Sequence, residues 1–364
     1  MLADKTRPAF PDTSFPVPRN RWYVAAFADE VTDQPMARTI LGERIVFYRT
    51  EQGVAVALSD YCAHRAMALS KGKRVNGDRL QCPYHGMEYG PDGQCRLVPS
   101  QEHAPRQMRV HAYPLVQRWE WLWIWTGDPA RADEGLIPDH SEFGFVEGSG
   151  YWKAKFWRMD FHSSAQLVQE NLLDVSHVTF LHEGMVDNGA LNAAPSTTTV
   201  EGDVVIVSRT FEDVMTGAYA QTFGMEEGSR VIRTNIGRTY VPSLNVSINV
   251  FEFPHEPGRP ARNFVSPMAI TPATDQSCHY FFTVGADYGE EPVGEAHRLR
   301  GQALWDLILT DKEAAEYIQQ AYNTFGAATP DVSVRADEGA VRYRRILARQ
   351  CLHEQRVADE ALAR

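Results

Sequence analysis

The chain has 364 residues, of which 43% are hydrophobic and 23% are charged, and its formal net charge is −11. This length and composition predict a globular protein of about two domains, and the acidic balance argues against nucleic acid and anionic membranes as partners. No apolar run in the sequence is long enough to span a bilayer. The first 20 residues hold prolines where a signal peptide has its apolar segment, which predicts a cytoplasmic protein.

Short runs rich in β-branched and aromatic residues dominate the first part of the chain. Such runs, separated by turns that contain glycine, are typical of β-strands. They predict strands over residues 22–26, 38–41, 44–48 and 54–58. Further along, tryptophans alternate with other residues from Trp119 to Trp125, which is typical of a strand buried on one face only. We therefore expect a small antiparallel β domain over about residues 1–128.

Two motifs in this first domain, Cys62-x-His64 and Cys82-x-x-His85, each combine one thiol with one imidazole. The five cysteines of the chain are odd in number and widely spaced, which does not suit a disulfide framework. Two cysteines and two histidines can hold a structural zinc ion, but zinc motifs usually place the two cysteines in one pair and the two histidines in another. The mixed pairs favour a [2Fe–2S] cluster with both cysteines on one iron and both histidines on the other.

Residues 126–150 are rich in glycine, proline and acidic side chains, and we interpret them as the connection between two domains. The second domain, residues 148–364, mixes strands with long helices. The sequence predicts strands over 203–207, 245–251 and 279–284, and helices over about the last 75 residues. The fold class is therefore α+β. The chain has no GxGxxG motif, so electrons from NAD(P)H should reach it through another protein.

The segment 171–182 reads as a helix that carries polar residues among apolar ones. Asn171, Asp174 and His177 lie close together on a helical projection, and His182 follows. Buried polar groups need a partner, so two histidines with a carboxylate one turn upstream indicate a metal site. For both histidines to bind one ion, the helix must end or bulge near Thr179, because five residues place them about 140° apart. Two hydrogen-bonded core histidines are the alternative.

The two motif sets, taken in this order, resemble those of the Rieske non-haem iron oxygenases. The resemblance covers nearly the whole chain, from about Trp22 to about Leu352. It implies a [2Fe–2S] cluster and one mononuclear Fe²⁺ per chain, and a helix-grip second domain in which two histidines and one carboxylate bind the iron. It also implies a homotrimer, a reductase or ferredoxin as electron donor, and O₂ as co-substrate. The cluster ligands would be Cys62, His64, Cys82 and His85.

The third iron ligand is predicted from a helix near the end of the chain. Residues 304–322 form an apolar stripe on which Asp311 lies, whereas Asp306, Glu313 and Glu316 point elsewhere. A carboxylate on a buried face needs a partner, and a buried arginine is the ordinary alternative to a metal. The segment 310–316 is also similar to the ligand-bearing segment of O-demethylating members of the family. The metal ligands are therefore predicted to be His177, His182 and Asp311.

Four further residues are assigned to the catalytic centre. Asp174 is predicted to accept a hydrogen bond from His177 through its carboxylate, and the resemblance implies that it also reaches His85 of the adjacent subunit. Asn171 is placed beside it. Asn249 and His279 lie on predicted strands of the second domain and could face the substrate, although an ordinary core or surface position explains each equally well.

The end of the chain resembles the monooxygenase branch of the family, whose members often hydroxylate a methoxy or N-methyl carbon. This resemblance implies O-demethylation of a small methoxy-aromatic acid with release of formaldehyde. Ring hydroxylation or dioxygenation, N-demethylation and attack on sulfonated aromatics are alternatives within the family. A Rieske electron carrier without oxygenation is the alternative from another class, but it would have no use for His177, His182 and Asp311.

Overall fold

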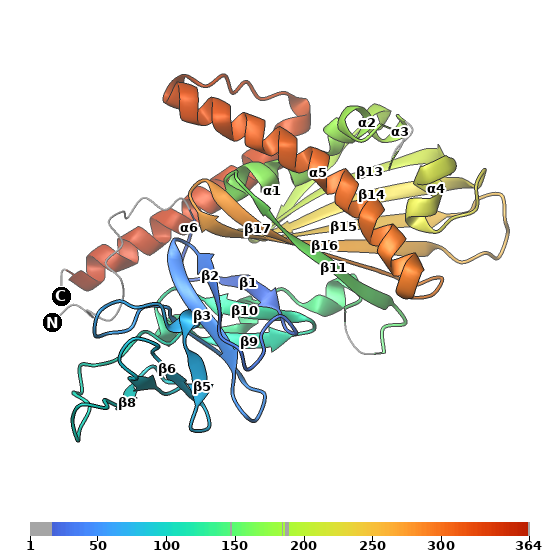
Figure 1. The fold of residues 1–364 in the computed structure, drawn as a ribbon. Helices are drawn as coiled ribbons and strands as arrows, with labels where there is room; N and C mark the ends of the chain where they lie inside the picture. Colours follow the sequence, from blue (N-terminus) through green and yellow to red (C-terminus); the bar gives the residue numbers. More distant parts are fainter. Residues whose placement is uncertain (1–16, 146–147, 184, 186–188, 363–364) are drawn as a thin grey trace. The chain divides into compact units, whose positions relative to one another are not determined.

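The computed structural model describes residues 17–145, 148–183, 185 and 189–362. The chain divides into two compact units (Figure 1). The first unit comprises Met1–Ile137 together with Thr271–Asp275, and the second comprises Pro138–Ile270 with Gln276–Arg364.

The first unit is built from three small sheets. The strand pairs are antiparallel, as short hairpin connections require. The sheets run in the orders β1-β10-β9, β2-β3-β4 and β5-β6-β7-β8. Their strands are β1 (Trp22–Phe27), β2 (Met36–Ile40), β3 (Glu43–Arg49), β4 (Ala55–Ser59), β5 (Lys73–Val75), β6 (Arg79–Gln81), β7 (Glu88–Tyr89), β8 (Cys95–Leu97), β9 (Leu115–Arg118) and β10 (Trp121–Trp125), with short 3₁₀ turns η1 (Leu69–Lys71), η2 (Pro129–Arg131) and η3 (Glu134–Leu136).

The tryptophan-rich strand β10 differs from its prediction. The alternation in the sequence predicted a strand with one face open to solvent, but every residue from Trp121 to Trp125 is buried. The residues between the tryptophans are Leu122 and Ile124, so both faces of the strand are apolar and both are covered. A fully apolar run of this length is typical of a strand in the interior of a protein. The prediction was wrong because it treated the alternating tryptophans as one face of the strand and overlooked that the residues between them are also apolar.

The second unit is a seven-stranded sheet with helices on one face (Figure 1). The sheet runs in the order β11-β17-β16-β15-β14-β13-β12. The strands are β11 (Trp152–Phe161), β12 (Thr197–Glu201), β13 (Val204–Val214), β14 (Arg230–Tyr240), β15 (Leu244–Glu252), β16 (Arg262–Thr274) and β17 (Ser277–Ala286). The helices are α1 (Ala165–Leu173), α2 (Val178–Leu181), α3 (Ala190–Ala193), α4 (Gly217–Phe223), α5 (Gly294–Phe325) and α6 (Glu338–Leu362), with 3₁₀ turns η4 (His140–Phe143), η5 (Val175–His177), η6 (Gly326–Ala328) and η7 (Arg335–Asp337).

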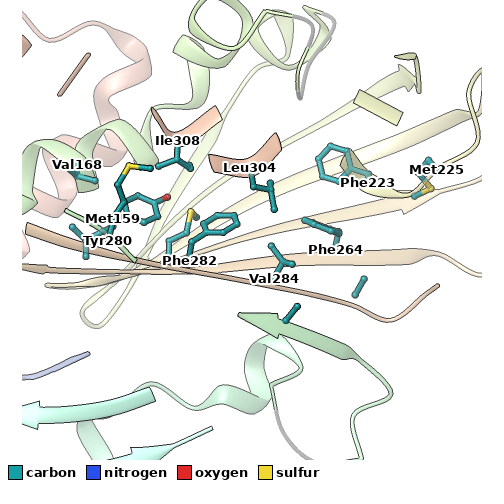
Figure 2. Close-up of a cluster of buried hydrophobic side chains, with 14 of the residues drawn as sticks. Met159, Val168, Phe223, Met225, Phe264, Tyr280, Phe282, Val284, Leu304 and Ile308 are labelled. Carbon is teal, nitrogen blue, oxygen red and sulfur yellow. The ribbon is translucent and has the colours of Figure 1, made fainter. Parts of the chain in front are cut away.

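The core of the second unit lies between the sheet and helices α1 and α5. Figure 2 shows Leu304 and Ile308 of α5 packed over Phe282 and Phe264 of the sheet, with Val168 of α1 nearby. Fully burying side chains of this size stabilises the fold by roughly 1.5–3 kcal/mol each. This layer therefore holds α5 firmly against the strands, and with it the acidic side chain that the helix carries.

Among the described helices, none is both long enough and apolar enough to cross a bilayer.

Candidate functional site

A broken helix brings the first two ligand candidates together. Helix α1 ends at Asp174, whose φ of −103° and ψ of 91° are not helical. The chain resumes as the 3₁₀ turn η5, continues into the four-residue helix α2, and ends helical geometry at His182 with φ −115° and ψ 37°. The predicted interruption exists, but it lies at Asp174 rather than near Thr179. The Asp174 carboxylate accepts the Ser176 N–H at 2.9 Å, which favours a new helical start there.

His177, His182 and Asp311 meet inside the second unit, and their ligand atoms all lie within 4.8 Å of one another. The Asp311 Oδ1 atom is 3.3 Å from His177 Nε2 and 3.1 Å from His182 Nε2. Two atoms bonded at right angles to one ion, with bonds of about 2.1 Å, lie about 3 Å apart. Two imidazoles and a carboxylate at these separations fit the set that holds non-haem Fe²⁺ on one face and leaves other positions open.

Hydrogen bonds to the outer ring nitrogens orient both histidines. The Thr310 hydroxyl donates its proton to the Leu307 carbonyl at 2.7 Å, so its oxygen accepts from His182 Nδ1 at 2.8 Å. His177 Nδ1 lies 2.5 Å from the Asp174 carbonyl oxygen, which can only accept. Both Nδ1 atoms are therefore protonated, which leaves both Nε2 lone pairs available for a metal. The predicted partner of His177 was the Asp174 carboxylate; the structure uses the backbone carbonyl of the same residue.

Asp311 is buried, with 4% of its surface exposed. Burial alone would raise its pKa, but the adjacent imidazoles of His177 and His182 lower that pKa to about 2. Burial likewise acts to lower the pKa of His177, and the neighbouring Asp311 carboxylate outweighs it and raises that pKa. Asn171 donates to Asp311 Oδ1 at 3.1 Å. No arginine or lysine of the described chain pairs with this carboxylate, so the alternative of a buried Asp–Arg pair finds no support.

A cavity of about 150 Å³ opens beside these three side chains. Most of its walls are apolar, and polar side chains from the sheet supply the rest. The apolar lining includes Leu172, Val178, Leu191, Phe223, Phe264, Met268, Phe282 and Leu304, and the polar lining includes Arg233, Asn235, Asn245, Ser247, Asn249 and Ser266. Such a mixture is typical of a site for a small, largely apolar ligand with a few polar groups.

Asn249 lies on the polar part of the lining, and its amide is held in one orientation. Its Oδ1 atom accepts from Arg233 Nε at 2.9 Å, from Arg233 Nη2 at 2.8 Å and from Asn235 Nδ2 at 3.0 Å. The opposite orientation would set an N–H group against these three donors. The Asn249 Nδ2 group donates to no described residue, so it is presented to the cavity as a hydrogen-bond donor.

His279 does not line this cavity among the described residues. Its Nδ1 lies 2.6 Å from Asp160 Oδ1 of strand β11. The neighbouring residues Tyr280 and Phe282 belong to the core between sheet and helices, and side chains alternate along a strand. His279 therefore points to the other face of the sheet. The sequence pattern could not distinguish the two faces, because the flanking residues of β17 are apolar on both.

Three contributors to the site were missed in the sequence, namely Arg233, Asn235 and Thr310. A signal existed for the first two, because Arg233 and Asn235 alternate along one strand as Asn245, Ser247 and Asn249 do along the next. Polar residues at every second position of two neighbouring strands indicate a polar patch on one sheet face. Thr310 carries no such signal, since an isolated threonine before an aspartate is common in helices.

In the first unit, the two Cys/His motifs occupy the turns after β4 and β6. Cys62 and Cys82 are buried, at 3% and 1% exposure, and the His64 and His85 ring centres are 4.7 Å apart. The His64 Nδ1 atom is buried without a hydrogen-bond partner in the described part of the chain. Such an atom is costly unless it binds something. Two adjacent imidazoles and two buried thiols fit the ligand set of a [2Fe–2S] cluster.

Comparison with known proteins covers both units. Residues 21–114 match the Rieske [2Fe–2S] domain, and residues 161–352 match the vanillate O-demethylase oxygenase C-terminal domain. The chain is 31% identical to the vanillate O-demethylase oxygenase subunit of Pseudomonas sp. strain HR199, over 95% of this chain and 98% of that protein. It is also 31% identical to the dicamba O-demethylase oxygenase component of Stenotrophomonas maltophilia, over 90% and 96% of the two chains.

Comparison with solved structures points to the same family. The crystal structure of dicamba monooxygenase bound to dicamba superposes with a TM-score of 0.82 at 29% identity, covering 93% of this chain and 98% of that one. A further structure of that enzyme, with non-haem iron and dicamba, gives a TM-score of 0.79 at 29% identity and the same coverage. The similarity therefore extends over both units and both candidate metal sites.

Proposed function

Since this chain belongs to the Rieske non-haem iron oxygenases, alongside the vanillate and dicamba O-demethylase oxygenase components, we propose that it demethylates a methoxy-substituted aromatic acid. It is an oxidoreductase that uses a Rieske [2Fe–2S] cluster and a mononuclear iron, and it works as the oxygenase component of a system with a separate electron donor. The match of the second unit to an oxygenase domain sets aside a simple electron carrier.

We assign the cluster to Cys62, His64, Cys82 and His85, and the mononuclear iron to His177, His182 and Asp311. The two assignments correspond to a cluster domain over residues 1–128 and a catalytic domain over residues 148–364. An iron held by His177, His182 and Asp311 would activate O₂ with electrons supplied by the cluster. The surrounding residues perform the other tasks, which are to orient the ligands, bind the substrate and exclude water.

The observation that carries the substrate proposal is the composition of the cavity beside the three iron ligands. Its apolar walls suit an aromatic ring, and the Asn249 N–H group suits an acceptor oxygen. Arg233 adds a positive charge behind Asn249, partly balanced by Asp213 at 3.7 Å. A donor backed by a guanidinium favours a carboxylate over a neutral acceptor, because hydrogen bonds to charged groups are stronger. A carboxylate on Asn249 would leave the methoxy end of the ring free to approach the iron.

The reaction balances as a two-electron monooxygenation. The methoxyarene, O₂, two electrons and two protons give the hydroxymethyl ether of the arene and one water. The hydroxymethyl ether is a hemiacetal, and it collapses to a phenol and formaldehyde when its hydroxyl proton is lost and the aryl–oxygen group leaves and is protonated. An apolar cavity wall supports this outcome, because it keeps bulk water away from the reacting carbon until the oxygen atom has been inserted.

We expect the enzyme, supplied with a compatible reductase and NADH, to consume O₂ and release formaldehyde from at least one methoxybenzoate. The measurement is a screen of the methoxybenzoate isomers, in which formaldehyde and the phenolic product are quantified against O₂ uptake. Equal amounts of formaldehyde and phenol support O-demethylation. A stable cis-dihydrodiol without formaldehyde would instead place the enzyme among ring dioxygenases, and formaldehyde from N-methyl substrates alone would favour N-demethylation.

The role of Asn249 gives a second prediction. Asn249→Asp is nearly isosteric and keeps one oxygen for Arg233 and Asn235, but it replaces the donor that faces the cavity with a carboxylate oxygen. We expect KM for the preferred methoxybenzoate to rise about 10- to 100-fold, since one hydrogen bond to a charged group is lost. The matched control is the corresponding neutral methoxybenzamide, whose KM should change far less. An equal rise for the acid and the amide would contradict a role in recognising the acid.

The assembly and its electron supply complete the proposal. We propose a homotrimer in which the cluster of one subunit passes electrons to the iron of the next subunit, where Asp174 links His177 to His85 of the cluster-bearing subunit. The direct donor is a reductase or a ferredoxin. We also propose a cytoplasmic location, where NAD(P)H is available to such donors. His279 does not line the cavity beside the iron ligands, and its contact with the substrate stays a prediction from the sequence.

A further inference from the structure

A second cavity, of about 330 Å³, adjoins the cavity beside the iron ligands. The two cavities share the lining residues Thr222, Leu304 and Leu307, so they meet at these side chains. The second cavity is also lined by Leu299, which is 56% exposed. It is therefore open to the protein surface near Leu299 and meets the cavity beside the iron ligands at the three shared residues. We call it the outer cavity.

The outer cavity contains one cation of the described chain, the guanidinium of Arg300. The guanidinium carbon lies 5.5 Å from the centre of the Trp152 ring. A Cβ atom at Gly224, which ends helix α4, would lie 3.5 Å from Arg300 Nη2, so the cation rests against the end of that helix. Burial lowers the pKa of Arg300, and the Tyr288 phenol partly opposes this. No carboxylate of the described residues forms an ion pair with it.

Arg300 and Asp311 lie on the same face of helix α5. Ala296, Arg300, Ala303 and Leu307 line the outer cavity, and Leu304, Leu307, Ile308 and Asp311 line the inner one. These positions recur every three or four residues and so form one continuous stripe. Eleven residues at 1.5 Å each separate Arg300 from Asp311 by about 16 Å along the helix axis. Arg300 and the iron ligands therefore lie at different points along this stripe, one beside the outer cavity and the other beside the inner cavity.

We propose that Arg300 forms a capture site for aromatic carboxylates, through which the substrate passes before it reaches the inner cavity. This inference rests on the proposed function for the identity of the substrate. The chain carries a formal net charge of −11, which repels an anionic substrate at long range. A half-buried guanidinium that pairs with no carboxylate among the described residues supplies a local attraction for the substrate carboxylate. The substrate carboxylate then leaves Arg300 and binds to Asn249 as the aromatic ring moves into the inner cavity.

The test measures how fast the oxidised holoenzyme associates with 4-methoxybenzoate, followed by stopped-flow tryptophan fluorescence, with neutral 4-methoxybenzamide as the comparison ligand. We expect Arg300→Gln to lower the association rate constant for the benzoate about tenfold and to flatten its salt dependence. The rate for the amide should stay within about twofold. Arg300→Lys should restore most of the rate for the benzoate, because it keeps the charge.

Arg298→Gln is the matched control, because Arg298 lies on the same helix with 64% of its side chain exposed and pairs with Glu295. It changes the net charge equally and should leave both rates unchanged. Equal losses in Arg298→Gln and Arg300→Gln would overturn the capture site, as would equal losses for the benzoate and the amide, or no binding of the benzoate by the wild type. The association experiment needs no turnover. Absence of formaldehyde from every methoxybenzoate would therefore refute the proposed function without deciding the capture site.

Discussion

Asp311→Ala should remove the mononuclear iron and abolish turnover while leaving the cluster spectrum intact. The carboxylate is one of three ligands, and replacing residues that merely support a ligand already costs about 10- to 100-fold in metal affinity. The loss of a direct ligand should therefore exceed about 100-fold. The cluster ligands belong to the other unit of the chain, so the absorption and EPR signals of the reduced cluster should persist. Iron counting by elemental analysis should fall from three atoms per chain to two.

Two neighbouring carboxylates provide controls for this variant. Glu313 is exposed, and Glu316 accepts the His162 N–H at 2.7 Å rather than facing the two histidines. Glu313→Ala and Glu316→Ala should both retain three iron atoms per chain and near-normal formaldehyde release. If either control lost iron while Asp311→Ala kept it, the assignment of the third ligand would be wrong, and the hydrogen bonds of Asp311 to the histidines would be purely structural.

The sequence was sufficient to find Asp311 because helical periodicity is strict. Residues 304–322 form a regular helix, so the side chain seven positions after Leu304 lies on the same face, and both residues are buried. The periodic argument weakens with distance from the site. Ile318 falls within the apolar stripe predicted over residues 304–322, yet it is 48% exposed, and its neighbour Gln319 is buried instead. An ideal helix drifts relative to a seven-residue repeat, and small shifts of phase decide the burial of the outer positions.

The sequence could not reveal where the ligand-bearing helix breaks. Helical projection placed Asp174 and His177 on one face, which suggested contact between carboxylate and imidazole. In the structure, the Asp174 carboxylate caps the following turn instead. The backbone carbonyl of Asp174 accepts the hydrogen bond from the His177 imidazole. Aspartate competes for nearby backbone N–H groups, and this local preference overrides the helical pattern. The polar cluster around Asn249 could not be predicted from the sequence either, because its members lie on different strands and their contact depends on the pairing register of the whole sheet.

The strongest test of the electron route concerns Asp174. Its two carboxylate oxygens accept the N–H and the hydroxyl of Ser176, each at 2.9 Å. Each oxygen has a further lone pair, so the group can still accept a hydrogen bond from His85 of a neighbouring subunit. In Asp174→Asn, one oxygen can keep the cap and the backbone carbonyl still holds His177. We therefore expect the trimer, the cluster and the mononuclear iron to survive, and electron transfer from cluster to iron to slow by orders of magnitude.

The measurement is a single-turnover experiment in which the chemically reduced enzyme meets substrate and O₂ while cluster oxidation is followed by absorbance. Ser176→Ala is the control, because it removes the hydroxyl contact to Asp174 and leaves the carboxylate in place. That variant should transfer electrons at close to the wild-type rate, whereas Asp174→Asn should not. A wild-type rate in Asp174→Asn would exclude the link between the two metal centres. Equal slowing in both variants, or loss of iron from Asp174→Asn, would show that Asp174 acts only by shaping the turn that positions His177.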